Sequence, residues 1–514
     1  MSSVSTHRSR SGKRTAPVVP GGAWGRFKRD LRDVRERYIK RTSKAHMRFV
    51  LALILGGAAL RVWAALQPIT GQEAIAFMTF GAKPFGEVIS NYALPINHVF
   101  HTLLSKWSVA LFGNNVIALR LPALLAGVLA LPFYYLFVRA MFNRYIALMA
   151  LAMAAASPCL IEVSALAHGY SITWLCLMVA LCAGRHFAKE NNVISVIIMA
   201  VACAFGMWAV PSMLVIALAV FLWAMFAVLT KYERSVGERM PVLGLGFLVF
   251  LVLSIVLYFP VILEHGIDQL FHHATDEQYS WKTFSLSYPD RVFDIWLWFV
   301  QPTYWWVALL GFIALTHAAY ISGKFRSILF AMCFGAIPLT LLLADVGDTY
   351  QWSYLLFMFH LGTAIAVFYL LKFIQDKMAK NFGKRSRTAG AAVVLFLGFA
   401  LPGMSVVLHR VDHLGEAKAC ADYLVEAMRP NDRLCLDGPW ETSVGFYLRS
   451  HDMSVQHLLG TPPPGGLQFI VVAQPQGQPL DVVLARCGEH MDGYGPAQKM
   501  KEWARMDIFA APLR

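Results

Sequence analysis

Charged residues are scarce in this sequence. Asp, Glu, Lys and Arg make up 15% of its 514 residues, whereas 57% of the residues are hydrophobic, and the mean hydropathy is +0.52. A soluble protein of this length has about a quarter of its residues charged, so the composition excludes an ordinary soluble enzyme. Many hydrophobic runs reach about 18 residues, which lets a helix cross a ~30 Å hydrocarbon core. The runs are continuous rather than alternating, which favours helices over strands.

Other expected patterns are also missing. No cysteine spacing resembles a zinc site, no internal repeat is present, and the C-terminal part has no Gly-rich phosphate loop. Transporters usually show internal repeats and intramembrane charges, whereas here no repeat is present and the acids cluster at the predicted outer edge, which favours an enzyme. Three cysteines follow the last hydrophobic run, where an oxidising compartment allows two of them to pair: Cys420, Cys435 and Cys487. The other cysteines are predicted to lie in helices, where they pack as small apolar side chains: Cys159, Cys176, Cys182, Cys203 and Cys333.

The net charge of +14 is concentrated at the N-terminus. Residues 1–48 hold fourteen Lys or Arg against Asp30, Asp33 and Glu36. This distribution is typical of a cytoplasmic tail held by anionic membrane lipids, and it argues against a nucleic-acid partner. Residues 26–46 are predicted to form a basic helix on the membrane surface. The first hydrophobic run starts near Met47, which is too late for a cleavable signal peptide.

The hydrophobic runs predict a polytopic α-helical membrane protein with about eleven transmembrane helices. Lys and Arg fall in one set of loops and most acids in the other, which indicates a cytoplasmic N-terminus. The acids of the predicted outer loops are Glu73, Glu162, Glu264, Asp268, Asp276, Glu277, Asp345 and Asp348. The predicted helices are 48–66, 116–138, 144–161, 169–187, 193–209, 211–229, 241–262, 292–317, 327–344, 351–371 and 389–408.

These patterns divide the chain into three parts. Residues 1–47 are the basic tail, 48–409 the transmembrane domain, and 410–514 a small extracytoplasmic α/β domain. The α/β prediction depends on helical patterns at 413–428, 441–450 and 479–490 and on strand patterns at 433–436 and 469–472. Two outer loops are long, 67–115 and 263–291, and long loops are often functional. The first contains helical patterns at 71–81 and 95–112, the second of them amphipathic.

Several short motifs follow one another between residues 48 and 190. Glu73 opens the first outer loop, in Thr70-Gly71-Gln72-Glu73-Ala74. The later motifs are Pro95-Ile96-Asn97-His98, Leu119-Arg120-Leu121-Pro122, Tyr134-Tyr135, Ser157-Pro158 and Ser164-Ala165-Leu166-Ala167-His168-Gly169-Tyr170. In this order, the motifs resemble the bacterial protein-mannosyltransferase-like and aminoarabinose-transferase-like glycosyltransferases of the GT-C superfamily.

The resemblance implies a GT-C-like fold in a bacterial inner membrane and an inverting glycosyltransferase. The donor would be a polyprenyl-phosphate hexose or pentose, and the acceptor an envelope glycan, a lipid or a protein on the extracytoplasmic face. Such a transfer needs a carboxylate base, a cation that neutralises the departing phosphate, and an apolar groove for the prenyl tail. Lys, Arg or a divalent cation such as Mg²⁺ or Mn²⁺ can supply that positive charge.

By the resemblance, Glu73 is the catalytic base, because it is the only acid near the start of the first outer loop. Two positions depart from the family pattern. The family often has Asp-Glu where this chain has Gln72-Glu73, and Glu-Ala-Arg where this chain has Leu166-Ala167-His168. Glu162 is the nearest replacement for the missing acid. His168 is a candidate replacement for the arginine, although a neutral imidazole is a poorer phosphate partner.

The remaining site residues are predicted from their loops. Lys83, Lys282 and Arg291 are candidates for the donor phosphate, with interfacial or solvated roles as the alternatives. His98 either contacts the acceptor or caps the surface helix. A metal site at His272, His273, Asp276 and Glu277 is a weaker prediction, because adjacent histidines do not share a helical face. The residues predicted to line the acceptor cavity are Gln72, Asn97, His98, Tyr170 and Asp348.

Two other functions stay open at this stage. One is a non-catalytic or repurposed GT-C relative that assists envelope polysaccharide assembly, which the departures at Gln72 and His168 support. The other is a transporter of lipid-linked sugars. Replacement of Glu73 distinguishes the enzyme from a scaffold, because only an enzyme loses turnover while donor binding persists.

Overall fold

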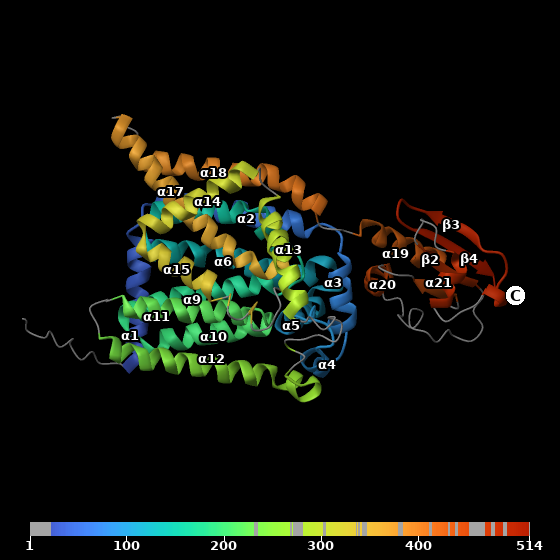
Figure 1. The fold of residues 1–514 in the computed structure, drawn as a ribbon. Coiled ribbons are helices and arrows are strands. Elements are labelled where there is room, and N and C mark those ends of the chain that lie inside the picture. The colour runs from blue at the N-terminus through green and yellow to red at the C-terminus, as the bar shows by residue number, and fades with distance from the viewer. Residues whose placement is uncertain are drawn as a thin grey trace, which may run out of the picture.

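The computed structural model describes most of the chain (Figure 1). The described residues are 22–230, 235–267, 270, 281–301, 305–335, 337, 340–341, 347–378, 384–410, 414–429, 432–436, 440–451, 468–473, 479–486 and 491–512. Several residues named above therefore lie outside the described part: Asp268, His272, His273, Asp276, Glu277, Asp345 and Cys487.

A bundle of long apolar helices forms the body of the molecule (Figure 1). Five described helices are long and apolar enough to span a membrane, or seven spans if each of two bent helix pairs counts as one. A polytopic helical protein is thus confirmed, whereas the count of eleven stays a prediction. The bundle helices are α2 (Lys44–Ala65), α6 (Val116–Met141), α7 (Arg144–Ala156), α8 (Pro158–Ala165), α9 (Tyr170–Glu190), α10 (Val193–Ala209), α11 (Met213–Leu229), α12 (Val236–His265), α13 (Trp281–Val300), α14 (Trp305–Ile321), α15 (Gly323–Phe334), α17 (Tyr354–Met378) and α18 (Lys384–Arg410).

Two predicted spans are wrong as single helices. The 292–317 segment belongs to two helices, α13 and α14, which end and begin at Val300 and Trp305. The predicted 144–161 helix is a pair, since α7 and α8 meet at Ser157 with a bend of 55°. Pro158 lacks an amide N–H, which breaks the hydrogen-bond ladder at this point. The main hydrophobic core lies deeper in the bundle, where α7 is buried along almost its entire length.

One end of the bundle carries the short helices of the first outer loop (Figure 1). They are α3 (Gly71–Ala76), a π-helical turn η2 (Phe77–Gly81), α4 (Phe85–Ser90) and α5 (Val99–Phe112). The helical patterns predicted at 71–81 and 95–112 are therefore confirmed. Asn97 holds this loop together: its side-chain N–H donates to the carbonyls of Val88 and Asn91, and its Oδ1 accepts from Thr102.

A C-terminal α/β unit lies beyond that same end of the bundle (Figure 1). Its four-stranded sheet has the order β1-β2-β4-β3, with β1 (Arg433–Leu436) parallel to β2 (Gln468–Ala473) and the other neighbours antiparallel. The predicted strands are present, whereas β3 (Gln498–Glu502) and β4 (Asp507–Pro512) were not predicted. The helices are α19 (Gly415–Ala427), α20 (Trp440–Ser450) and α21 (Leu480–Arg486). Cys435 is disulfide-bonded and Cys420 is free.

The N-terminal basic helix lies at the opposite end of the bundle (Figure 1). It comprises α1 (Gly22–Arg35) and a π-helical turn η1 (Glu36–Lys40). Basic groups from two other connections gather there, because Arg139 donates to the carbonyl of Tyr38 and Lys324 to the carbonyl of Met141. The described structure thus separates a basic end from the end that holds Glu73.

Candidate active site

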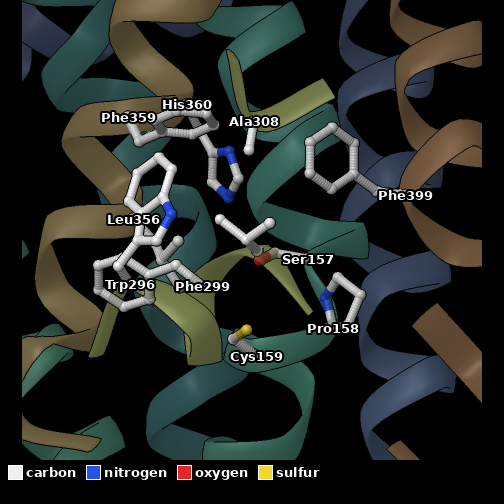
Figure 2. A pocket seen from close by; sticks show the side chains of 11 residues that line it. Ser157, Pro158, Cys159, Trp296, Phe299, Ala308, Leu356, Phe359, His360 and Phe399 are labelled. Atoms are coloured by element: carbon white, nitrogen blue, oxygen red, sulfur yellow. The ribbon is translucent and has the colours of Figure 1, made fainter. Parts of the chain in front are cut away.

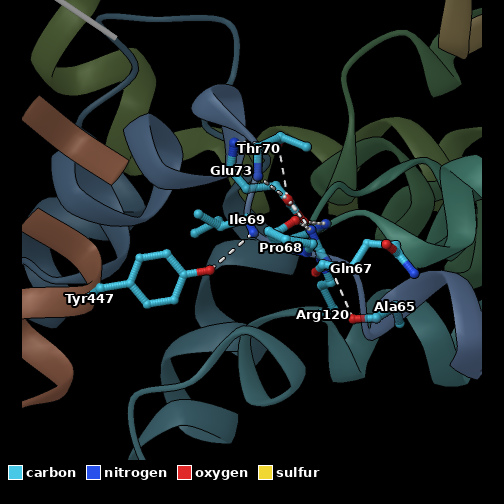
Figure 3. A network of polar contacts seen from close by, with 9 residues as sticks. Ala65, Gln67, Pro68, Ile69, Thr70, Glu73, Arg120 and Tyr447 are labelled. Carbon is cyan, nitrogen blue, oxygen red and sulfur yellow. Dashed lines mark hydrogen bonds and ion pairs between the residues drawn. The ribbon is translucent and has the colours of Figure 1, made fainter. Parts of the chain in front are cut away.

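A buried ion pair lies at the start of the first outer loop. Thr70 caps α3, and Glu73 completes a capping box by accepting from the Thr70 backbone N–H. Glu73 and Arg120 of α6 are both fully buried, and two hydrogen bonds of 2.6 and 2.7 Å join them. Figure 3 shows the two side chains meeting above the Ala65–Thr70 segment. A bidentate pair of this kind is short and rigid.

All hydrogen-bonding positions of both side chains in this ion pair are occupied. Glu73 accepts five hydrogen bonds: two from Arg120, two from Thr70, and one of 2.7 Å from the backbone N–H of Ala167. Arg120 uses its remaining N–H groups on the carbonyls of Ala65, Gln67 and Pro68. A carboxylate offers about four lone-pair sites, so none of them is left for an acceptor hydroxyl.

The electrostatics agree with this geometry. Burial alone would raise the pKa of the Glu73 carboxyl, but the charge and hydrogen bonds of Arg120, with smaller contributions from His168 and Thr70, outweigh it and lower that pKa to about 2. A carboxylate with so low a pKa takes up a proton poorly at neutral pH. The catalytic role of Glu73 stays a prediction, and its surroundings favour a structural one.

Two histidines and a tyrosine lie next to Glu73. The Nδ1 atom of His98 accepts a 2.8 Å hydrogen bond from the backbone N–H of Gly169, so a neutral His98 carries its proton on Nε2. His98 occupies the N-cap position of α5, as the capping alternative predicts, but its side chain makes no capping hydrogen bond. The His98 ring contacts the rings of His168 and Tyr170, at centroid distances of 5.6 and 5.0 Å.

The surroundings of both imidazoles disfavour their charged forms. Burial lowers the pKa of His98 well below its ordinary value, and the proximity of His168 lowers it further. Burial also lowers the pKa of His168, although the charges of Glu73 and Asp348 oppose that effect. A neutral His168 supplies a hydrogen bond to a phosphate but no compensating charge, so it replaces an arginine only in part.

A second group of acids lies beside these rings. Glu162 in α8 is buried, and its Oε1 accepts a 3.0 Å hydrogen bond from the Tyr350 hydroxyl. Asp348 is exposed, and its Oδ2 accepts a 2.9 Å hydrogen bond from the Tyr170 hydroxyl. The rings of Tyr170 and Tyr350 contact each other at 6.0 Å. The contacts therefore connect five groups into one polar cluster: Glu162, Tyr350, Tyr170, Asp348 and His98.

An apolar cavity of about 50 Å³ lies along α8, next to this cluster. Figure 2 shows the His360 ring directed into it, among aromatic side chains from α13, α17 and α18. Neither ring nitrogen of His360 has a hydrogen-bond partner within the described part of the chain. Cys159, one turn of α8 before Glu162, also lines the cavity. The cavity thus lies one turn of α8 away from Glu162.

The predicted site residues divide into two sets. The structure brings together Glu73, Glu162, His98, His168, Tyr170 and Asp348. Asn97 is fully buried and occupied within its loop. The remaining predicted residues are exposed: Gln72, Lys83, Lys282 and Arg291.

No group of three or more His, Cys, Asp and Glu side chains that could hold a metal ion occurs among the described residues. The predicted metal site at 272–277 lies outside them, so it stays a prediction.

Sequence reasoning assigned no role to Arg120. A single arginine inside an otherwise apolar span is itself a signal, since such charges almost always have a partner. That signal identifies Arg120 but not Glu73 as its partner. No sequence pattern indicates that Tyr350 donates to Glu162.

Known proteins share features with this chain. Residues 99–259 match the family model described as dolichyl-phosphate-mannose-protein mannosyltransferase. The fold is similar to that of ArnT from Cupriavidus metallidurans in the apo state, with a TM-score of 0.60 and 14% identity over 91% of this chain and 98% of that one. It is equally similar to ArnT bound to undecaprenyl phosphate, with a TM-score of 0.60 and 13% identity over the same shares. A comparison with curated protein sequences gives no significant match.

Proposed function

We propose that this chain, a member of the GT-C superfamily of membrane glycosyltransferases, transfers a sugar from a polyprenyl-phosphate donor to an acceptor hydroxyl. Three findings support the proposal: the family-model match, the GT-C fold, and the similarity to a protein solved with undecaprenyl phosphate. The observation that carries it is the polar cluster around Glu162 and Tyr350, which lies beside an apolar cavity. A reaction centre for an amphiphilic donor needs both kinds of surface.

We assign the base to Glu162 rather than to Glu73. The acceptor oxygen forms a bond to the anomeric carbon, the bond from that carbon to the phosphate oxygen breaks, and Glu162 takes the acceptor proton. The phosphate leaves with the bonding electron pair, and the anomeric configuration inverts in this single displacement. Glu162 is buried beside Tyr350, whereas every lone pair of Glu73 is already engaged by Arg120, Thr70 or Ala167.

The departing phosphate needs a positive charge. Lys83, Lys282 and Arg291 are the outer cations we propose for it, because His98 and His168 are neutral. All three are exposed and carry long side chains, whose charged ends stay at the water-facing surface where a donor phosphate would lie. A bound Mg²⁺ or Mn²⁺ would supply the same charge, and activity that survives a chelator would remove that alternative.

The test uses the full chain in nanodiscs with a panel of polyprenyl-phosphate sugars and a lipid extract as acceptor. Glu162→Gln should lower turnover by at least about 100-fold while donor binding persists. Glu87→Gln, on the exposed face of α4, is the matched control and should keep wild-type turnover. Wild-type turnover in Glu162→Gln would contradict the assignment of the base.

One specific observation favours a second, non-catalytic function. Gln72 and His168 occupy positions where related sequences often have an acid and an arginine, which suits a non-catalytic relative that still binds lipid-linked sugars. Donor binding without transfer or hydrolysis in the wild type, across the whole donor and acceptor panel, would favour that function. Donor movement between leaflets in the same vesicles would favour a transporter.

A further inference from the structure

In the segment that connects α2 to α3, few backbone N–H and carbonyl groups lack a hydrogen bond. The carbonyls of Ala65, Gln67 and Pro68 accept from Arg120, and the Thr70 N–H donates to Glu73. Ile69 lies between these groups, and both of its backbone groups bind the C-terminal part of the chain. Its N–H donates to the Tyr447 hydroxyl at 3.2 Å, and its carbonyl accepts from the Leu414 N–H at 3.0 Å. We call residues 65–70 the strap.

Figure 3 shows how the strap is held from two sides. Arg120 approaches it from the membrane bundle, whereas Tyr447 approaches it from α20 of the C-terminal unit. Glu73 follows the strap directly and binds both Arg120 and the Ala167 N–H, next to His168. A displacement of Ile69 is therefore transmitted through Thr70 and Glu73 to the segment that carries His168.

Packing supports the same connection. Ile69 is fully buried, in a hydrophobic core that includes residues from the first outer loop and from the C-terminal unit. The rings of Phe77 and Phe446 meet edge to face at 5.4 Å, and Asn114 donates to the Phe446 carbonyl at 3.3 Å. The C-terminal unit thus shares a core with the first outer loop instead of hanging from a linker.

We propose that the C-terminal unit is a structural part of the candidate active site, and that Tyr447 is a positioning residue which fixes the strap and, through it, Glu73 and His168. The hydrogen bond requires an oxygen acceptor at this place, because the buried Ile69 N–H would otherwise lose its partner. Burial raises the pKa of Tyr447, so the hydroxyl stays neutral at physiological pH. The role of Tyr447 in fixing the strap follows from these contacts alone, whereas the effect of Tyr447 on catalysis also depends on the proposed function.

The first test measures amide hydrogen exchange of the full chain in nanodiscs. Tyr447→Phe keeps the ring but removes the acceptor, so exchange of the Ile69 amide should become about tenfold faster. Asn114→Ala loosens the same interface at a different contact and should accelerate exchange across residues 66–73. Tyr423→Phe removes a hydroxyl from α19 of the same unit and should leave the strap unchanged. Unchanged strap exchange in both test variants would overturn the proposal.

The second test measures transfer kinetics. Tyr447→Phe should lower kcat several-fold while the KM for the donor stays near its wild-type value, because Tyr447 acts on the strap and not on the cations proposed for the donor phosphate. A melting temperature within a few degrees of wild type shows that the variant is folded. Faster strap exchange with no transfer in the wild type would leave the positioning role in place and remove the proposed function. A fall in kcat with unchanged strap exchange would reject the positioning role.

Discussion

Glu73 illustrates how neighbouring groups decide whether a carboxylate can act as a base. It lies at the start of the first outer loop, where the sequence resemblance predicts a base, but a capping box, an arginine and a backbone amide occupy its oxygens. Desolvation of a charged pair is tolerated only when such partners are complete. We therefore expect substitutions of Glu73 to lower activity through the fold of the outer loop rather than through proton transfer.

The low pKa of Glu73 predicts a specific dependence of stability on pH. The folded-state value of about 2 lies below the ordinary value of 4.5, so the carboxylate stabilises the fold above pH 4.5, and this stabilisation is lost as the pH falls toward 2. A shift of this size corresponds to about 3 kcal/mol. Unfolding in detergent, followed from pH 7 to pH 2, should show that loss in the wild type.

Glu73→Gln provides the comparison. It lacks the titrating group, so its stability should be lower at pH 7 and should depend less on pH between 4.5 and 2. Glu87→Gln should behave like the wild type, because Glu87 is exposed on α4. Identical pH profiles for Glu73→Gln and the wild type would show that the carboxylate is not held by Arg120 in the folded state.

At the scale of residues, the sequence predicts where the acids lie but not which side chains they bind. Charge patterning places Glu73 and Glu162 at the outer edge, because the loops alternate in sign. Glu73 and Arg120 are 47 positions apart, and Glu162 and Tyr350 are 188 apart. No local pattern indicates which side chains meet over such separations. The choice between the two acids as base therefore needed the structure.

At the scale of elements, the break between α7 and α8 is the feature with the clearest cause. Pro158 cannot donate to the carbonyl of Ala154, and a free carbonyl inside a membrane is costly. Arg61 in α2 resolves this, because its guanidinium donates to the carbonyls of Ala154 and Ala155 at 3.2 and 2.8 Å. The arginine thus stabilises the bend that presents Glu162 at the cluster.

Arg61→Met should consequently destabilise the bundle by about 2–4 kcal/mol, since two buried carbonyls lose their donors. The measurement is the melting temperature in detergent. Arg48→Met is the matched control, because Arg48 lies on an exposed face of the same helix and should change stability by less than about 0.5 kcal/mol. Equal melting temperatures for the two variants would show that the carbonyls find other donors.

Element prediction succeeded for several strongly apolar segments, but it missed the exposed strand β3 and also the partly buried strand β4. The apolar runs of α10 and α11 and the strand β1 were predicted to within two residues, because their burial is reflected directly in their composition. The strand β3 was missed because all five of its residues are exposed at a sheet edge, as in Lys499 and Lys501. The boundary between α13 and α14 was missed because both flanks are rich in tryptophan and phenylalanine.

At the scale of the whole molecule, the two ends of the bundle differ in chemistry. Arg139 and Lys324 are held near the N-terminal helices, whereas Glu73, Glu162 and Asp348 lie toward the C-terminal unit. The positive-inside rule then predicts that the basic end is cytoplasmic and the candidate site extracytoplasmic. A lipid-linked donor would meet its acceptor on that outer side, within reach of a unit that carries a disulfide.

This orientation is testable with single substitutions at exposed positions of each end, Lys28→Cys in α1 and Lys501→Cys in β3. A membrane-impermeant maleimide should label Lys501→Cys in intact spheroplasts, whereas Lys28→Cys should react only after permeabilisation. The unsubstituted chain gives the background, because its free cysteines are buried or half-buried within the described residues. The reverse labelling pattern would place the site in the cytoplasm, where acceptors and donors differ, and would contradict the proposed function together with the orientation.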